Sequence, residues 1–334
     1  MIIHIFYPKK GFYLSIKRSF EPLVRELKKH HDVKEFFVPY IGANPINMLR
    51  NILYVKKHRT EIGVNHIAGD IHYCILGLIG TKNVLTIHDD YAMRKSTHGW
   101  LGKMQKYLFW IWLPIKYADK VICITETTKK NIAKYYNNEK LQVIAHHCMN
   151  EDFHYYPKEF NKECPTIFQC GTDFHKNLDT LIAALEGIKC KLVVLVKMTS
   201  AQCNLAKEKH VVYKNYYNIS NEEVFDLYKC ADIVTFVSSY EGFGMPIIEG
   251  QCTGRIVITT NKEPMNWVAG KNCALFVDDP KNVEEYRKAI LKAINDDEYR
   301  NNCIKNGLKN VKRFTLSNIT TVHEIPLTFQ KVTN

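Results

Sequence analysis

Two glutamates stand on either side of a glycine-containing turn in the stretch VTFVSSYEGFGMPIIEGQCTG, residues 234–254. Gly242 and Gly244 allow the backbone to approach a ligand closely, and a helix that starts after them offers amide groups to phosphate or sugar oxygens. The carboxylates of Glu241 and Glu249 suit the hydroxyl groups of ribose or a hexose. The residues alone also allow Glu241 to be a solvated loop acid and Glu249 a partner of the helix dipole.

The elements around this stretch are expected to aim both acids at one place. SNEE, residues 220–223, is a capping box that starts a helix, and ADIVTFVS, residues 231–238, predicts a buried strand. Pro246 suits the first turn of a helix, so the next helix is predicted to begin at about Met245. Glu249 is one turn inside that helix. Because helical side chains lean toward the N-terminus, its carboxylate could reach the ligand of Glu241 from another side.

Short apolar strands alternate with amphipathic helices along the whole chain. Apolar, β-branched runs such as NVLTIH (83–88) and KLVVLV (191–196), separated by helices, indicate parallel strands buried on both faces. The pattern restarts after a polar segment near 150–164. This predicts an α/β protein of two Rossmann-like, doubly wound domains, 1–155 and 164–315, with a C-terminal helix at 316–334 that could pack back on the first. Ligands bind at the carboxyl ends of such strands, so we expect the domains to face a cleft.

Composition limits the environment and the partners. No apolar run approaches ~18 residues, so no membrane-spanning helix is expected. The eleven Cys lack disulfide or metal spacing, which is typical of a reducing cytoplasm. Residues 1–160 hold 24 Lys and Arg against 14 Asp and Glu, a net charge of +10, while the rest of the chain carries only +2. Such a one-sided positive field attracts a phosphorylated substrate, anionic lipid or nucleic acid.

Two other segments have simpler interpretations than a specialised site, and two motifs that would indicate other functions are absent. The aromatic and basic segment WLGKMQKYLFWIWLPIKYADK (100–120) is interpreted first as core, with contact to an anionic bilayer as the role of another face. HHCMNEDFH (146–154) could suggest zinc, but its spacing fits no usual closed site. No G-x-G-x-x-G follows the first strand, which disfavours a dinucleotide-dependent dehydrogenase. No recognised nucleic-acid module accompanies the charge, so nucleic acid is not expected as a partner.

The sequence resembles glycosyltransferase family 4, the retaining nucleotide-sugar transferases with the GT-B fold. SSYEGFGMPIIEGQCTGRIVITTN is similar to the E-x7-E motif of that family, IFQCGTDFHKNLDTLIAAL (167–185) to its glycine-then-KN segment, and NKEPMNWVAGKNCALFVDDPKNVEEYRKAI (261–290) to its VAG ending. VLTIHDD (84–90) and ADKVICITETTKKNI (118–132) match weaker landmarks. The likeness is strong from about 166 to 290 and looser before that.

The resemblance implies a role for each matching position. Glu249 would bind the ribose of the donor, Glu241 the transferred sugar, and Lys176 the diphosphate. The backbone of the turn would hold sugar hydroxyls and phosphates, through Gly242, Phe243, Gly244 and Met245, as would Gly11 after the first strand. His88 and Asp89 would lie under the reacting sugar carbon. By itself, His88 could also be a hydrogen-bonded structural residue.

This chain departs from the family pattern in several places. The family often has Gly-Arg where this chain has Gly171-Thr172, so one diphosphate cation is missing. Thr172 could donate a hydrogen bond instead, and Lys197 could supply charge. Only Gly11 stands where two glycines are usual, and Trp267 occupies a position where glutamate is common.

The chemistry expected is sugar transfer without a metal or other cofactor. No Asp-x-Asp clamp stands out, and a lysine with a helix N-terminus can stabilise a leaving diphosphate. No residue suits a covalent nucleophile, so same-face attack assisted by the donor phosphate is favoured. The leading hypothesis is a cytoplasmic transferase, peripheral on the cytoplasmic face of a membrane, that extends a glycan or lipid-linked acceptor for a surface polysaccharide such as O-antigen, capsule or lipopolysaccharide. A nucleotide-sugar epimerase and a non-catalytic sugar-nucleotide or membrane-surface binding protein are the alternatives.

Overall fold

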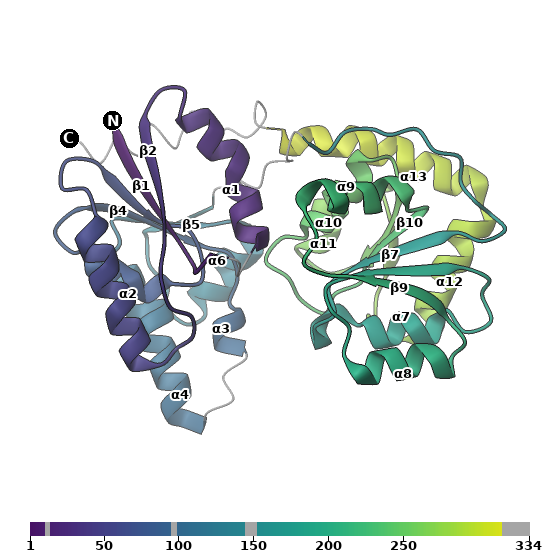
Figure 1. Ribbon diagram of the computed structural model, residues 1–334, viewed down its shortest axis with the longest axis horizontal. Helices are drawn as coiled ribbons and strands as arrows, with labels where there is room; N and C mark the ends of the chain where they lie inside the picture. The colour runs from purple at the N-terminus through teal and green to yellow at the C-terminus, as the bar shows by residue number, and fades with distance from the viewer. Residues whose placement is uncertain (11–13, 95–98, 144–151, 316–334) are drawn as a thin grey trace. The chain divides into compact units, whose positions relative to one another are not determined.

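The computed structural model describes residues 1–10, 14–94, 99–143 and 152–315 (Figure 1). Two compact units are built on Met1–Asn150 and Glu151–Phe314, called here the N-terminal and C-terminal units. Each contains one parallel six-stranded sheet with helices between its strands. Gly11, the helix predicted at 316–334 and His146, His147 and Cys148 lie outside the described residues.

The N-terminal unit has the strand order β2-β1-β3-β4-β5-β6. Every neighbouring pair is parallel, and the apolar runs of the sequence supply fully buried strands such as β3. Two clusters of buried side chains fill the two sides of this sheet. The strands are β1 (Ile2–Tyr7), β2 (Asp32–Phe37), β3 (Val64–Ile67), β4 (Lys82–Ile87), β5 (Lys120–Cys123) and β6 (Leu141–Val143), and the α-helices are α1 (Leu14–Leu27), α2 (Pro45–His58), α3 (Tyr91–Arg94), α4 (Gly99–Lys106), α5 (Leu113–Tyr117) and α6 (Glu126–Ala133), with a 3-10 helix, η1, at His72–Leu78.

The C-terminal unit has the order β12-β11-β10-β7-β8-β9. Its central strand β10 is buried along its whole length. The strands are β7 (Thr166–Cys170), β8 (Lys191–Leu195), β9 (Val212–Tyr216), β10 (Ile233–Phe236), β11 (Ile256–Thr260) and β12 (Leu275–Val277), and the helices are η3 (Phe174–Lys176), α7 (Leu178–Ala184), α8 (Ser200–Glu208), α9 (Asn221–Cys230), α10 (Met245–Cys252), α11 (Met265–Ala269), α12 (Val283–Asn295), α13 (Asp297–Asn310) and η4 (Val311–Phe314).

The aromatic segment 100–120 contains three helical pieces. Between α4 and α5 the chain forms a π-helix, Tyr107–Trp112, in which Trp110 and Ile111 are buried. The core interpretation holds for this middle piece. It does not hold for α4, where no residue of Gly99–Lys106, a range described in full, is buried. In the part of the chain that the structure describes, the helices are too short or too polar to cross a bilayer.

Candidate active site

The loop after β10 turns into α10 at a glycine that no other residue could replace without strain. Gly244 has φ +119°, and a Cβ atom there would lie 2.9 Å from Cδ1 of Ile247 and 3.4 Å from Cε1 of Phe236. The helix begins at Met245, as predicted, with Pro246 in its first turn. Because the first amides of a helix have no partner within it, this turn presents donors at the carboxyl end of the sheet.

Lys176 and Glu241 meet beside this turn. Nζ of Lys176 lies 2.5 Å from Oε1 of Glu241, and the two side chains are only 16% and 15% exposed. The same ammonium lies 4.4 Å from the centre of the Phe236 ring, the ring that Gly244 also approaches. The predicted cation, one predicted acid and the start of α10 are therefore gathered at one point.

Gly171 makes room for the lysine. It has φ +97°, and a Cβ atom there would lie 3.1 Å from both Cγ and Cε of Lys176. The aliphatic part of the Lys176 side chain thus packs against the backbone at 171. Because Gly171 has no side chain in the way, the short spacing between the two residues still allows Lys176 to reach Glu241.

A buried hydrogen-bond network ties the loop after β7 to the loop after β10. Asn177 adopts the left-handed conformation, with φ 52°, and its side-chain amide donates to the carbonyls of His175 and Val237 and to Oγ of Ser239. The amide of Ser239 donates in turn to the carbonyl of His175. The asparagine of the KN pair could not be given a role from the sequence, because Val237 and Ser239 lie about sixty positions away.

Gln169 extends this network under the lysine. Its side-chain amide donates to the carbonyl of Lys176 at 3.1 Å, while its side-chain oxygen accepts from Oγ1 of Thr235. Both side chains are fully buried. A satisfied buried network of this kind rigidifies the backbone that carries the lysine. Nothing in the local sequence pattern pointed to either residue.

His175 also lies near Glu241. Its ring stacks on Tyr240, with 4.8 Å between centroids and 24° between planes, and its Nε2 lies 3.8 Å from Oε1 of Glu241. His175 and Tyr240 were not predicted from the sequence as residues of the site. Their aromatic stack fixes the loop on which Glu241 stands.

Glu249 is inside α10 and is only 5% exposed. It accepts a hydrogen bond of 2.5 Å from the hydroxyl of Tyr228, which is itself fully buried on α9. Burial, and then the nearby Glu249 carboxylate, raise the pKa of the Cys252 thiol to about 11. The capping box at Ser220 correctly placed the helix that carries Tyr228, but the contact between Tyr228 and Glu249 was not predicted.

Thr172 and Lys197, the proposed substitutes for the family arginine, contact one another. Oγ1 of Thr172 donates to the carbonyl of Lys197 at 3.1 Å. The ammonium of Lys197 lies 5.9 Å from the centre of the Tyr217 ring. The hydroxyl hydrogen of Thr172 is thus used within the protein, and would have to turn away from Lys197 to reach a ligand.

His88 and Asp89 follow β4 in the N-terminal unit. The backbone carbonyl of His88 accepts from Oγ1 of Thr128, and Oδ1 of Asp89 accepts from the amide of Tyr91 at the start of α3. The ring of His88 lies 6.0 Å from that of Phe20. Both residues are at the carboxyl end of a parallel strand, where the sequence placed them.

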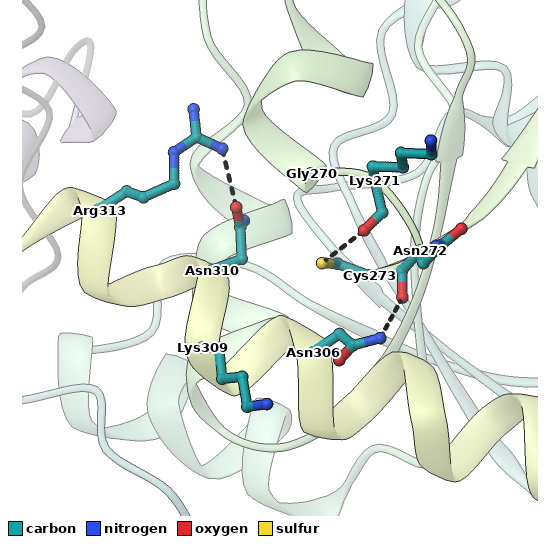
Figure 2. A pocket seen from close by; sticks show the side chains of 8 residues that line it. All are labelled: Gly270, Lys271, Asn272, Cys273, Asn306, Lys309, Asn310 and Arg313. Atoms are coloured by element: carbon teal, nitrogen blue, oxygen red, sulfur yellow. Dashed lines mark hydrogen bonds between the residues drawn. The ribbon is translucent and has the colours of Figure 1, made fainter.

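An open pocket elsewhere in the C-terminal unit has a different lining (Figure 2). It carries three cations, but the side chains of Lys271, Lys309 and Arg313 extend in different directions in Figure 2. Arg313 also donates to Oδ1 of Asn310 and to the carbonyl of Trp267. The cations therefore do not converge on a common anion. The lining residues are Gly270, Lys271, Asn272, Cys273, Asn306, Lys309, Asn310 and Arg313. Among the residues described, no three His, Cys, Asp or Glu side chains gather as a metal site would require.

Comparison with known families divides the chain as the two sheets do. Residues 3–146 match the family described as Glycosyltransferase Family 4, and residues 150–310 match the family described as Glycosyl transferases group 1. O-antigen chain mannosyltransferase B of Escherichia coli is 33% identical over 115 residues, which are 34% of this chain and 29% of that protein. An uncharacterized glycosyltransferase of Methanocaldococcus jannaschii is 24% identical over 93% of this chain and 92% of its own length.

Solved structures share the architecture at low identity. The structure of HepE from Anabaena in complex with UDP and glucose has a TM-score of 0.73 and 14% identity over 98% of this chain and all of that one. The predicted GT-B fold, with its two parallel α/β units, is confirmed.

Proposed function

The chain belongs to glycosyltransferase family 4, and from this premise we propose that it moves a sugar, with retention of configuration, from a nucleotide-diphosphate donor to a hydroxyl of a glycan or lipid-linked acceptor. One observation carries the proposal: the Lys176 ammonium and the Glu241 carboxylate meet beside the amino-terminal turn of α10. A sugar diphosphate needs a positive charge near its phosphates and, beside it, a hydrogen-bond acceptor for the hydroxyl groups of its sugar.

The reaction breaks the bond between the anomeric carbon and a diphosphate oxygen and forms a bond from that carbon to the acceptor oxygen. Negative charge develops on the leaving diphosphate, and Lys176 with the first amides of α10 would stabilise it. Glu241 would accept hydrogen bonds from the sugar. The acceptor proton would pass to the departing phosphate oxygen, so that attack occurs on the face that the leaving group vacates.

Glu249 would accept hydrogen bonds from the ribose hydroxyls in this proposal. Tyr228 donates to Oε2 of Glu249, and a carboxylate has acceptor sites on both oxygens. The tyrosine would therefore hold the carboxylate in one orientation while its other sites receive the ligand. His88 and Asp89 would contact the reacting sugar from the N-terminal unit, as Gly11 would contact the phosphates.

The acceptor is proposed to belong to a surface polysaccharide. The similarity to an O-antigen chain mannosyltransferase supports this choice, and the UDP and glucose bound by HepE support a nucleotide-sugar donor. A lipid-linked acceptor would bring the enzyme to the cytoplasmic face of a membrane. The excess of positive charge in residues 1–160 would favour an anionic membrane there.

Substitution of Lys176 by Ala tests the central observation. The loss of one preorganised charge is expected to lower kcat for sugar transfer by about 10²–10³, with an unchanged circular dichroism spectrum. The matched control is Lys191→Ala, an exposed lysine at the amino end of β8, which should transfer sugar at the normal rate. Normal turnover by the Lys176→Ala protein would remove that residue from the mechanism.

The donor alone separates transfer from epimerisation. A transferase incubated with a nucleotide sugar and no acceptor gives at most slow hydrolysis, whereas an epimerase changes the configuration of the sugar. A non-catalytic protein would bind the donor and leave it intact with any acceptor. The placement of Lys176 against Glu241 favours transfer over simple binding, because a lysine on the diphosphate matters most when the diphosphate leaves.

We also propose that transfer needs no metal ion, for the same electrostatic reason. If Lys176 and α10 supply the positive charge, transfer should continue at an unchanged rate after treatment with EDTA. Rapid loss of activity in EDTA, restored by a divalent cation, would show that a metal ion shares that task.

A further inference from the structure

Helix α2 exposes apolar side chains on the face opposite the core. Its inner face packs Met48 and Val55 into the N-terminal unit and satisfies Asn51 by hydrogen bonds to Tyr40 and Tyr73. A surface helix normally carries polar residues on its other face. Here that face carries large aliphatic residues at a helical spacing, namely Ile46 (62% exposed), Leu49 (57%) and Leu53 (54%).

Helix α4 adds a second exposed apolar group next to the first. The side-chain amide of Gln105 donates to the carbonyl of Ala43, just before α2, and contacts Sδ of Met48 within it. The amino-terminal end of α2 therefore lies against the carboxyl-terminal part of α4. We call the exposed residues of these two helices and of the loop before α2 the α2–α4 surface; its apolar members are Ile41, Ile46, Leu49, Leu53, Trp100, Leu101 and Met104.

The charges on this surface have one sign. Residues 36–60 and 91–118, which contain α2, α4, the π-helix and α5, include no Asp or Glu. Arg50, Lys57 and Lys103 are exposed among the apolar side chains, and Lys56 flanks them on α2. Apolar residues mixed with Lys and Arg, with Trp100 70% exposed, match the interface of an anionic bilayer, where apolar side chains insert and cations meet the headgroups.

We propose that the α2–α4 surface docks on the anionic face of a lipid bilayer. A second copy of the chain fits less well, because a symmetric contact would place Arg50, Lys57 and Lys103 against their own copies without an acid from either helix to pair them. The docking proposal rests on the proposed function in one respect only: a lipid-linked acceptor would explain why the protein binds a membrane.

Sedimentation with vesicles tests the docking without any use of sugar transfer. The full chain is expected to bind vesicles of phosphatidylcholine with phosphatidylglycerol, to release them as salt is raised, and to bind pure phosphatidylcholine weakly. Substitution of Leu49→Ser with Leu53→Ser should lower the partition coefficient at least about tenfold. Arg50→Gln with Lys57→Gln and Lys103→Gln should lower it about a hundredfold.

The matched control is Ile62→Ser with Val212→Ser, which removes two exposed aliphatic side chains elsewhere, 85% and 66% exposed. It should bind vesicles like the original protein. Equal binding by the Leu49→Ser, Leu53→Ser variant would overturn the proposal, as would binding that ignores lipid charge. A concentration-dependent dimer, lost in that variant and unaccompanied by vesicle binding, would assign the surface to a second copy instead.

Donor binding keeps this outcome separate from that of the proposed function. Binding of a nucleotide sugar, measured by calorimetry without lipid, should be the same in the surface variants and the original protein. Vesicle binding without donor binding would support the docking surface and contradict the proposed sugar transfer. Donor binding without vesicle binding would contradict the docking surface and leave the proposed function standing.

Discussion

Val196 is held in a backbone conformation that β-branched residues rarely adopt. Its φ is +88°, although it directly follows β8 and is 48% exposed. Asn215 imposes this conformation, because its side chain donates to the carbonyls of Val194 and Val196 and accepts from the amide of Met198. The strained residue therefore lies beside Lys197, at the carboxyl end of the strand, where part of the donor-binding site was predicted. Strain at such an edge is a common property of ligand-binding loops.

Replacement of Val196 by Gly is expected to stabilise the protein by about 1 kcal/mol. Relief of the positive φ gains ~1–3 kcal/mol, while the extra freedom of glycine in the unfolded chain costs about 0.5–1 kcal/mol. Urea denaturation measures the difference. The control is Val212→Gly on β9, an exposed valine without a positive φ, which should be destabilised. A similar loss of stability in both variants would show that Val196 is not strained.

The loop after β7 and the loop after β10 behave as one unit because Asn177 joins them. Its three donated bonds and its left-handed backbone place the preceding residue, Lys176, where its ammonium reaches Glu241. Asn177 is thus a positioning residue: it acts through the lysine.

Asn177→Ala should therefore impair both stability and catalysis. The lost hydrogen bonds and the φ of 52° predict a destabilisation of about 2–3 kcal/mol, and a displaced lysine predicts a fall in kcat of about tenfold or more with little change in KM for the acceptor. Asn177→Gly can adopt the left-handed backbone conformation but lacks the side-chain hydrogen bonds. It should therefore lose less stability than Asn177→Ala and show the same fall in kcat.

Asn218→Ala is the matched control, because Asn218 also has a left-handed backbone, φ 56°, but is exposed and remote from Lys176 in sequence. It should lose about 1 kcal/mol of stability and no activity. If Asn177→Ala behaves in the same way, the asparagine has no part in placing the lysine.

Local patterns predicted the elements well and the contacts between elements poorly. The capping box at Ser220 and the helix start at Met245 are confirmed, because both depend on neighbours within a few residues. Strand β9 was not predicted: it is one of the two edge strands of its sheet, and VYKNY with Val212 exposed lacks the continuous apolar run of a buried strand. The Tyr228–Glu249 bond was missed for a different reason, since only the packing of α9 near α10 brings the two together.

The π-helix at Tyr107–Trp112 shows the same limit. Aromatic residues at helical spacing predicted a packed helix, and Trp110 is indeed buried. The exposure of Trp100 one helix earlier depends on where α4 leaves the core, which a run of aromatic and basic residues cannot indicate. Whether Glu241, Lys176 and their neighbours bind a donor stays a prediction; their proximity to one another is a finding.

The two units have separate cores. A cluster of buried residues from β7 to α13 fills one side of the C-terminal sheet, and two other clusters fill the N-terminal unit. The residues proposed to hold the donor are divided unequally between them: Lys176, Glu241, Glu249 and the start of α10 all belong to the C-terminal unit. The sequence predicts domains at 1–155 and 164–315 from the restart of the strand–helix pattern.

A fragment that spans residues 152–315 should consequently fold alone and bind nucleotide without transferring sugar. Its sheet, its core and the Gln251–Asn310 bond that links α10 to α13 are all internal, so none of these contacts depends on the first 150 residues. Calorimetry against a panel of nucleoside diphosphates should give the same preferred base as the full chain, with a Kd within about tenfold, or ~1.4 kcal/mol. Lys176→Ala in the fragment should weaken that binding, and Lys191→Ala should not. A folded fragment that binds no nucleotide, beside a full chain that does, would show that the N-terminal unit supplies essential donor contacts, and the assignment of diphosphate binding to Lys176 and α10 would have to be given up.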